Sequence, residues 1–439
     1  MAVACESNPS CLAAAGNSSS PLPSRRQSLF GWRRWQCKQR KDLGLSLRRS
    51  RMGGLCRSGG AEDGDQPYGV PETAVPSQWD VVGLGQAMVD CSAMVGNDAL
   101  ERLQLEKGVR TVIDHEQRGK VLQALDGRSY KVSAGGSLSN TLVALARLGT
   151  GRINVAMTGS VGKDPLGDFY RTKLLRANVH FLSSPMVRGT TGTVIVLTTP
   201  DAQRTMLSYQ GMSSVIEYDQ VLAKALSASR LLVVEGYLWE IPQTIQALSR
   251  ACQEARKANV LVALTASDAS CISRHRDQFW DVMESSADIL FANSDEARAL
   301  CGFGSSTSPS FAAQHLSRYC KLVSVTDGAR GSYIALAGSV VYVPPSRRCK
   351  PVDTCGAGDA YAAGLLYGLL CNAPNLRGIG SLAAKVAAMV VSQQGARLRH
   401  EDANQLAMEF ALQQQQQQAS PPELKVRNGD LESGTGANL

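Results

Sequence analysis

Short runs of aliphatic and β-branched residues alternate with longer amphipathic segments across residues 79–410. One amphipathic segment carries leucines at positions 138, 142, 145 and 148, the spacing of a single helix face. Alternation of this kind favours an α/β fold built on a doubly wound sheet with helices on both faces. The segments expected to form strands are 80–84, 153–158, 193–198, 231–235, 260–264, 289–292 and 322–326.

Two regions interrupt this alternation. Residues of about 90–133 and 181–212 contain β-like stretches without long helices between them. We expect them to form a small separate sheet at the edge of the main domain.

The positive charge of the chain lies almost entirely at one end. The formal net charge is +8, and residues 1–60 contain nine Arg and two Lys against Glu6 and Asp42. A stretch rich in Arg and Ser and poor in acids is typical of an organelle transit peptide. The alternative is a basic arm that binds nucleic acid, but the rest of the chain offers no matching basic surface. We expect a transit peptide at 1–60 and a chloroplast location, with mitochondrion or cytoplasm as alternatives.

The segments that flank the body differ from it in composition. Residues 61–78 are rich in Gly, Asp, Glu and Pro and read as a linker, and 79–410 form the expected domain. A run of glutamines at 413–418 precedes a polar tail, so residues 411–439 are expected to be disordered.

Membrane, disulfide and metal proteins find little support. No apolar run approaches the roughly 18 residues of a membrane span. Four of the twelve cysteines lie within 1–60, and the other eight form no Cys-x-x-Cys pair. We therefore expect a reduced protein without a structural metal.

Two glycine patterns imitate nucleotide-binding loops and fail on inspection. The segment VVGLGQAM after the first expected strand has Met88 in place of the third glycine of a dinucleotide fingerprint. The segment GSVGKD at 159–164 lacks the first glycine of a phosphate loop, where Met157 stands, and has Asp164 in place of Ser or Thr.

A third pattern, VDTCGAGDAY at 352–361, runs directly into an apolar helical segment. Gly356 and Gly358 leave backbone N–H groups uncovered at a helix start, where they and the helix dipole attract anions. Asp359 in the first turn is placed either to cap the helix or to accept a proton from an attacking hydroxyl during phosphoryl transfer.

Further polar segments accompany this pattern. Gly135, Gly136 and Asn140 open the leucine-striped helix, where they form either a capped turn or a ligand site. The segments FANSDE at 291–296 and VTDGARG at 325–331 follow expected strands. Ligands of open α/β sheets bind beyond the carboxyl ends of the strands.

Four segments in this order, GGSLSN, NSDE, TDGARG and DTCGAGD, resemble the motifs of the pfkB-type carbohydrate kinases, the superfamily of ribokinase, fructokinase and adenosine kinase. The likeness covers about residues 79–400. The segments GLGQAMVD at 83–90 and GGSLSNT at 135–141 are most similar to the adenosine kinase-like branch. The resemblance implies a ribokinase-like α/β sandwich with the small sheet as a lid.

The resemblance also implies roles for individual residues. Asp359 would be the catalytic base, beside an anion hole formed by the backbone of Gly356, Ala357 and Gly358. Substrate hydroxyls would be held by Asp90, Gly135, Gly136 and Asn140. ATP and Mg²⁺ would be organised by Asn293 and Glu296, with Glu296 holding the metal through water, and Thr326 and Gly328 would line the nucleotide site. Arg204 stands either at a phosphate-facing position or on the surface.

The implied activity is ATP- and Mg²⁺-dependent phosphorylation of a primary hydroxyl on a sugar or nucleoside. Gln86 and Ala87 replace the Asn and Pro common in adenosine kinases, so an adenosine kinase proper is an alternative rather than the expectation. A non-catalytic plastid scaffold is the other alternative. We expect a monomer or homodimer with a small-molecule substrate, and neither nucleic acid nor membrane as a partner.

Overall fold

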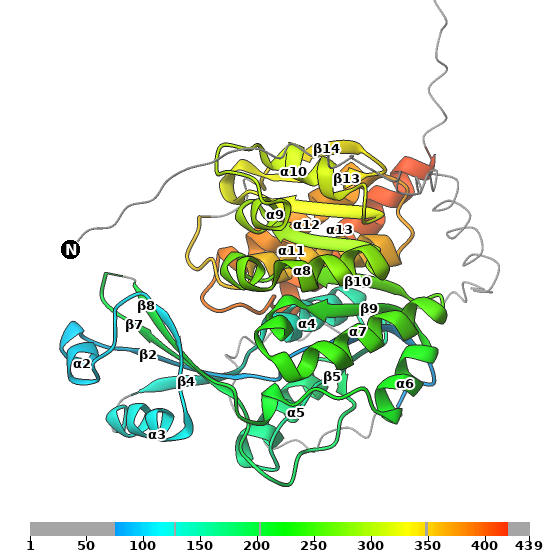
Figure 1. Ribbon diagram of the computed structural model, residues 1–439. Coiled ribbons are helices and arrows are strands. Elements are labelled where there is room, and N and C mark those ends of the chain that lie inside the picture. Colours follow the sequence, from blue (N-terminus) through cyan, green and yellow to red (C-terminus); the bar gives the residue numbers. More distant parts are fainter. Residues whose placement is uncertain (1–74, 127–128, 202, 347–349, 420–439) are drawn as a thin grey trace, which may run out of the picture. The chain divides into compact units, whose positions relative to one another are not determined.

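A nine-stranded sheet forms the centre of the computed structural model (Figure 1), which describes residues 75–126, 129–201, 203–346 and 350–419. The strand order is β14-β13-β12-β11-β10-β9-β1-β5-β6. The seven strands β12-β11-β10-β9-β1-β5-β6 pair in parallel with their neighbours, whereas β13 and β14 complete one edge as an antiparallel hairpin. The strands are β1 (Trp79–Leu84), β5 (Val155–Thr158), β6 (Val179–Phe181), β9 (Ser229–Glu235), β10 (Leu261–Thr265), β11 (Ile289–Asn293), β12 (Leu322–Thr326), β13 (Ser332–Leu336) and β14 (Ser339–Val343).

Helices cover both faces of this sheet. One face carries α6 (Gln220–Ser227), α7 (Pro242–Lys257), α8 (Ala269–Ser285), α9 (Ser294–Cys301) and α10 (Pro309–Leu316). The other carries α4 (Ser137–Gly149), α11 (Ala357–Leu370), α12 (Leu376–Val391) and α13 (His400–Ala419). Helix α5 (Pro165–Arg176) packs on β6. The sandwich buries both faces of parallel strands, which explains why their sequences are almost continuously apolar.

The second sheet has five strands in the order β3-β8-β7-β2-β4. It is built from β2 (Val89–Met94), β3 (Arg110–Val112), β4 (Tyr130–Ala134), β7 (Thr193–Thr198) and β8 (Arg204–Tyr209), and it carries the short helices α2 (Asn97–Arg102) and α3 (His115–Ala124). We call this unit the small sheet. Its own core includes Ile195, Leu197 and Leu207, each fully buried.

Of the connections between the small sheet and the main sheet, two lie beside the candidate site. Residues 85–88 lead from β1 to β2, and Gly135 with Gly136 leads from β4 to α4. The first connection starts at the carboxyl end of β1, and the second ends at the amino end of α4. This joint between the two sheets therefore lies beside β1 and α4.

The strands predicted from the sequence all form, and their ends differ from the predicted ones by at most two residues. The small sheet also forms from the two predicted regions, although α2 and α3 lie within the first of them. Strand β6 and the hairpin β13–β14 were not predicted. The hairpin has a two-residue turn, Ala337-Gly338, in which both residues have positive φ. Because Ala337 is not a typical turn residue and apolar runs flank the pair, the turn is not evident from the sequence.

The prediction of a disordered tail from residue 411 is wrong for its first part, because α13 continues to Ala419. Helix α13 packs through Leu406, Ala407 and Phe410, all buried, and glutamine is a good helix former that extends an anchored helix. Residues 420–439, the expected transit peptide at 1–60 and linker residues 61–74 lie outside the described residues. Within the described ranges, no helix is long and apolar enough to span a membrane.

Candidate active site

The predicted site segments meet at the carboxyl ends of the parallel strands. In the sheet register Leu84 lies beside Val234, and Asn293 lies beside Thr326. Since parallel strands end at one common edge, the loops that follow β1, β9, β10, β11 and β12 share that edge.

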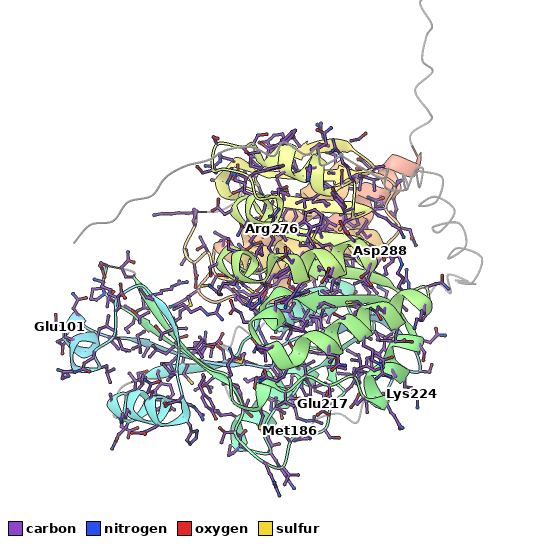
Figure 2. All side chains as sticks on the ribbon, in the orientation of Figure 1. Glu101, Met186, Glu217, Lys224, Arg276 and Asp288 are labelled. Atoms are coloured by element: carbon purple, nitrogen blue, oxygen red, sulfur yellow. The ribbon has the colours of Figure 1, made fainter. Side chains whose placement is uncertain are left out.

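Carboxylates at the opposite edge have structural partners. Asp288, labelled in Figure 2, precedes β11 and accepts a hydrogen bond from the N–H of Val262 at 3.0 Å. It also pairs with Lys321 at 2.8 Å. The acids of the carboxyl edge, described next, are buried groups whose pKa values are raised.

Helix α11 begins without a side-chain cap. Gly356 occupies the N-cap position with φ of +77°, a conformation that favours glycine, and a Cβ there would lie 2.6 Å from Ala396. Ala357 follows as the first helical residue. At Gly358 a Cβ would meet nothing within 4 Å, so the backbone of the first turn is open to a ligand. Its uncapped N–H groups and the helix dipole make this turn suited to an anion.

Asp359 projects from this turn toward α4 rather than capping its own helix. Its carboxylate accepts hydrogen bonds from Ser137 Oγ at 2.6 Å and from Asn140 Nδ2 at 3.1 Å. Burial raises the pKa of Asp359 to about 6, and these two hydrogen bonds oppose the rise. A carboxylate with this pKa is mostly ionised at neutral pH and still basic enough to take up a proton. The alternative role as a helix cap is wrong.

Asp90 and the Gly135–Gly136 turn lie against each other at the joint of the two sheets. A Cβ at Gly135 would lie 2.1 Å from Asp90 Oδ2, so only glycine permits the carboxylate to pack there. Gly136 has φ of +89°, and a Cβ on it would lie 2.9 Å from the carbonyl oxygen of Gln86. Burial raises the pKa of Asp90 to about 7; Arg397 opposes the rise and Asp359 adds to it.

Asn293 and Glu296 form a reciprocal cap at the start of α9. Asn293 Oδ1 accepts from the N–H of Glu296 at 2.8 Å, and Glu296 Oε2 accepts from the N–H of Asn293 at 2.8 Å. The Asn293 side chain also donates to Glu296 Oε1 at 2.7 Å. Burial raises the pKa of Glu296 to about 7, and nearby carboxylates, Asp359 among them, add to the rise.

This arrangement fits a hydrated magnesium ion better than a directly chelated one. In the described part of the chain, no three His, Cys, Asp or Glu side chains gather as a metal site. Magnesium commonly keeps several waters and is bound by one or two carboxylates together with substrate phosphates. Glu296, buried and repelled by other carboxylates, would gain from a cation nearby.

Thr326 and Gly328 lie at the end of β12. Thr326 is the last strand residue, and Gly328 opens a short 3₁₀ turn with φ of +55°. A Cβ on Gly328 would meet nothing within 4 Å, so this turn, like the start of α11, is open to a ligand.

Two side chains at this edge were not selected from the sequence. Glu235 ends β9, is 2% exposed and accepts a hydrogen bond from the N–H of Gln86 at 3.0 Å. Burial raises the pKa of Glu235 to about 8. Ser137, one of the two partners of Asp359, lies within the Gly-Gly-Ser segment at 135–137. Its place in that segment was the sequence feature from which its role in the site could have been predicted.

Arg204, in β8, is not a free surface side chain, and its contacts are with the loop before α11 rather than with the first turn of that helix. Its guanidinium pairs with Asp353 at 2.9 Å and contacts Cys355 Sγ, and both residues belong to the loop before α11. Arg204 therefore connects β8 of the small sheet to the loop that carries the open helix turn.

Comparison with known proteins identifies the family of the chain. The model of the pfkB family of carbohydrate kinases matches residues 110–403. The chain belongs to this family. Adenosine kinase from Sinorhizobium meliloti superposes with a TM-score of 0.67 and 31% identity, covering 76% of this chain and 99% of that one. A probable sugar kinase from Rhizobium etli CFN 42 gives a TM-score of 0.68 and 29% identity, covering 77% and 100%.

Among curated relatives, guanosine-inosine kinase of Escherichia coli K12 is 26% identical over 274 residues. That match spans 60% of this chain and 62% of the relative's length. A 5-dehydro-2-deoxygluconokinase of Listeria monocytogenes is 21% identical over 304 residues, spanning 66% of this chain and 84% of the relative. The structures and relatives agree with the ribokinase-like α/β fold and the adenosine kinase-like branch of the family.

Proposed function

We propose that this protein is a kinase that transfers the γ-phosphoryl group of ATP, with Mg²⁺, to a primary hydroxyl of a sugar or nucleoside. The observation that carries the proposal is the position of Asp359. Its backbone belongs to the open first turn of α11, whereas its carboxylate contacts Ser137 and Asn140 beside the Gly135–Gly136 turn. This position supports a proton acceptor between the proposed phosphoryl site and the proposed site of the acceptor hydroxyl.

In the proposed reaction, Asp359 takes the proton of the acceptor hydroxyl as that oxygen bonds to the γ-phosphorus. The bond between the γ-phosphorus and the bridging oxygen breaks, and ADP leaves with its electrons. The N–H groups around Gly356, Ala357 and Gly358 hold the charge that spreads over the transferred group. Bound Mg²⁺ would neutralise the phosphate charge, with Glu296 and Asn293 as the residues placed to hold its waters.

The acceptor side is assigned to Asp90, Gly135, Gly136 and Asn140. An ionised Asp90 accepts hydrogen bonds from two neighbouring hydroxyls, the pattern that a ribose or another sugar presents. The small sheet, which carries Asp90, would serve as the lid that excludes water from the transferred group. Thr326 and Gly328 would contact the ATP nucleotide beyond the triphosphate.

The proposed identity of the acceptor rests on the named relatives and on one residue, Gln86, that differs from the adenosine kinases. Relatives named for adenosine, guanosine-inosine and sugars suggest nucleosides first and free sugars second. Gln86, at the Asn position of adenosine kinases, donates from Nε2 to Gln210 Oε1 at 2.5 Å. Because Gln86 is engaged with the end of the small sheet, purine recognition by this segment would differ from that of an adenosine kinase proper.

The test is ADP release by the purified full chain with Mg²⁺-ATP and a panel of adenosine, guanosine, inosine, ribose and fructose. We expect one acceptor to give ADP and phosphorylated product in equal amounts, and EDTA to abolish both. In the same assay, Asp359→Asn should lower the turnover by about 10²–10⁴-fold. Its control is Asp98→Asn, which removes an acid from an exposed ion pair with Arg102. No turnover with any acceptor would favour the alternative of a non-catalytic scaffold, although Asp359 and Gly358 are both present.

We also propose that residues 1–60 act as a plastid transit peptide, on the basis of their Arg-rich and acid-poor composition. Fusion of residues 1–75 to a fluorescent reporter should direct the reporter to chloroplasts. Mitochondrial fluorescence would reassign the organelle, and a diffuse cytosolic signal would refute the targeting role.

A further inference from the structure

Arg397 lies outside all the family motifs, in the segment that joins α12 to α13, yet its side chain reaches the acceptor side of the site. Its Nη2 donates to Ser139 Oγ at 3.2 Å, and its Nε is buried without a hydrogen-bond partner among the described residues. The backbone around it is held on both sides. Gln393 Nε2 donates to the carbonyl of Arg397 at 2.5 Å, and Arg147 donates to the carbonyl of Leu398.

Ser139 connects Arg397 to the Gly135–Gly136 turn. The fully buried Ser139 Oγ donates to the carbonyl of Gly135 at 2.5 Å. The N–H of Gly135 donates in turn to the carbonyl of Met88 at 2.8 Å, and Asp90 packs directly on Gly135. The turn therefore lies between the Arg397–Ser139 contact on one side and Asp90 on the other.

Arg397 also acts on Asp90 as a cation. The charged or titratable groups around Asp90 include Arg397 from the segment before α13, Asp359 from α11, Tyr170 from α5 and the neighbouring Cys91. Arg118 of α3 acts on Cys91. Arg397 lowers the pKa of Asp90, whereas Asp359 raises it. Without Arg397, the rise in the pKa of Asp90 caused by burial and by the charge of Asp359 would no longer be opposed, so Asp90 would take up a proton more readily.

We propose that Arg397 is a positioning residue for the acceptor: it fixes the Gly135–Gly136 turn through Ser139 and supplies the positive charge that faces Asp90. The substrate part of this inference rests on the proposed kinase function. The coupling between Arg397 and Asp90 does not, so it can be tested without any substrate.

The first experiment is a double-mutant cycle on the stability of the full chain, with Arg397→Gln, Asp90→Asn and the double variant at pH 6 and pH 9. The folded pKa of Asp90 lies above its ordinary value, so its contribution to stability falls as the pH rises through the interval between them. Loss of Arg397 moves the folded pKa higher and extends this fall.

We therefore expect Arg397→Gln to lower the urea midpoint more at pH 9 than at pH 6, and this difference to vanish in the Asp90→Asn background. The matched control is Arg399→Gln, which removes the same charge from an exposed position two residues away. Equal losses at both pH values, or a difference that persists with Asp90→Asn, would overturn the coupling.

The second experiment measures KM and kcat for the acceptor that the wild type phosphorylates. At pH 7 we expect Arg397→Gln to raise the acceptor KM about tenfold with little change in kcat, and the KM to recover as the pH rises. Arg397→Lys should restore the pH profile, since it restores the charge. Ser139→Ala should raise KM by a similar factor at every pH, because it cuts the contact and keeps the charge.

An Arg397→Gln enzyme with the KM and pH profile of Arg399→Gln would overturn the positioning role even if the coupling to Asp90 is found. If the wild type phosphorylates no acceptor, the proposed function fails, and the stability cycle alone decides whether Arg397 and Asp90 are coupled.

Discussion

The hydrogen bond from Ser137 to Asp359 offers a graded test of the proposed base. Ser137→Ala removes the donor at 2.6 Å from Asp359 Oδ1 and leaves the bond from Asn140 in place. Because the lost bond stabilises the ionised carboxylate, the pKa of Asp359 must rise. The carboxylate itself stays in position, so the variant changes the proton affinity of the base without deleting it.

The size of the shift follows from the energy of one charged hydrogen bond. Such a bond is worth about 1.5–3 kcal/mol, and one pKa unit corresponds to about 1.4 kcal/mol. The pKa of Asp359, raised by burial to about 6, should therefore move up by roughly one to two units. At pH 7 the ionised fraction falls from about 0.9 to between about 0.1 and 0.5, which predicts a roughly two- to tenfold loss of kcat/KM.

The assay is the pH profile of acceptor kcat/KM between pH 5 and 9. The acid limb should move upward in Ser137→Ala, and the two enzymes should converge near pH 9. Thr199→Ala is the matched control, since it removes a hydroxyl bond of 2.6 Å to Asp201 in the small sheet. An unmoved acid limb, or a loss of equal size at every pH, would refute the assignment of that limb to Asp359.

Four further predictions concern other parts of the protein. Gly358→Ala should fold normally, because its Cβ would meet nothing within 4 Å, but lose about 10²-fold in kcat/KM for ATP by misplacing the phosphoryl group. Gly356→Ala should instead lose about 1–3 kcal/mol of stability in urea unfolding, because alanine is strained at φ of +77°. Glu235, with its pKa raised by burial to about 8, weakens the fold as the pH rises from about 4.5 to 8, so Glu235→Gln should be more stable than wild type at pH 8 and similar at pH 5 by urea unfolding. Phe279→Ala, which removes the ring stacked on Trp239 at 4.1 Å between centroids, should cost about 3–5 kcal/mol with an unchanged ATP KM.

Most of the main sheet could be predicted because its strands are buried on both faces and its helices carry clear stripes. The leucine stripe of α4 is an example, since Leu138, Leu142, Leu145 and Leu148 are all at most 1% exposed. Strand β6 has only three residues, too short for its pattern to stand out. Helix α13 escaped prediction at its end because packing at Phe410, rather than local composition, anchors it.

The site could be predicted where glycines and acids stand in fixed spacing, as at 353–359. Pairings between distant segments could not. The bond from Ser137 to Asp359 joins residues 222 positions apart, and the contact from Arg397 to Ser139 joins residues 258 apart. Asn293 and Glu296 were predicted to organise ATP and Mg²⁺. Their reciprocal capping of α9 was not predicted, because the sequence alone did not locate the start of that helix.

The most direct test of the central claim is the single-turnover rate of phosphoryl transfer from ATP to the acceptor by Asp359→Asn. If Asp359 is the base, the rate should fall by about 10²–10⁴-fold. ATP should bind no more weakly than to the wild type, because the amide removes a negative charge beside the phosphoryl site. A transfer rate close to that of the wild type, in a folded protein that binds ATP, would contradict the account.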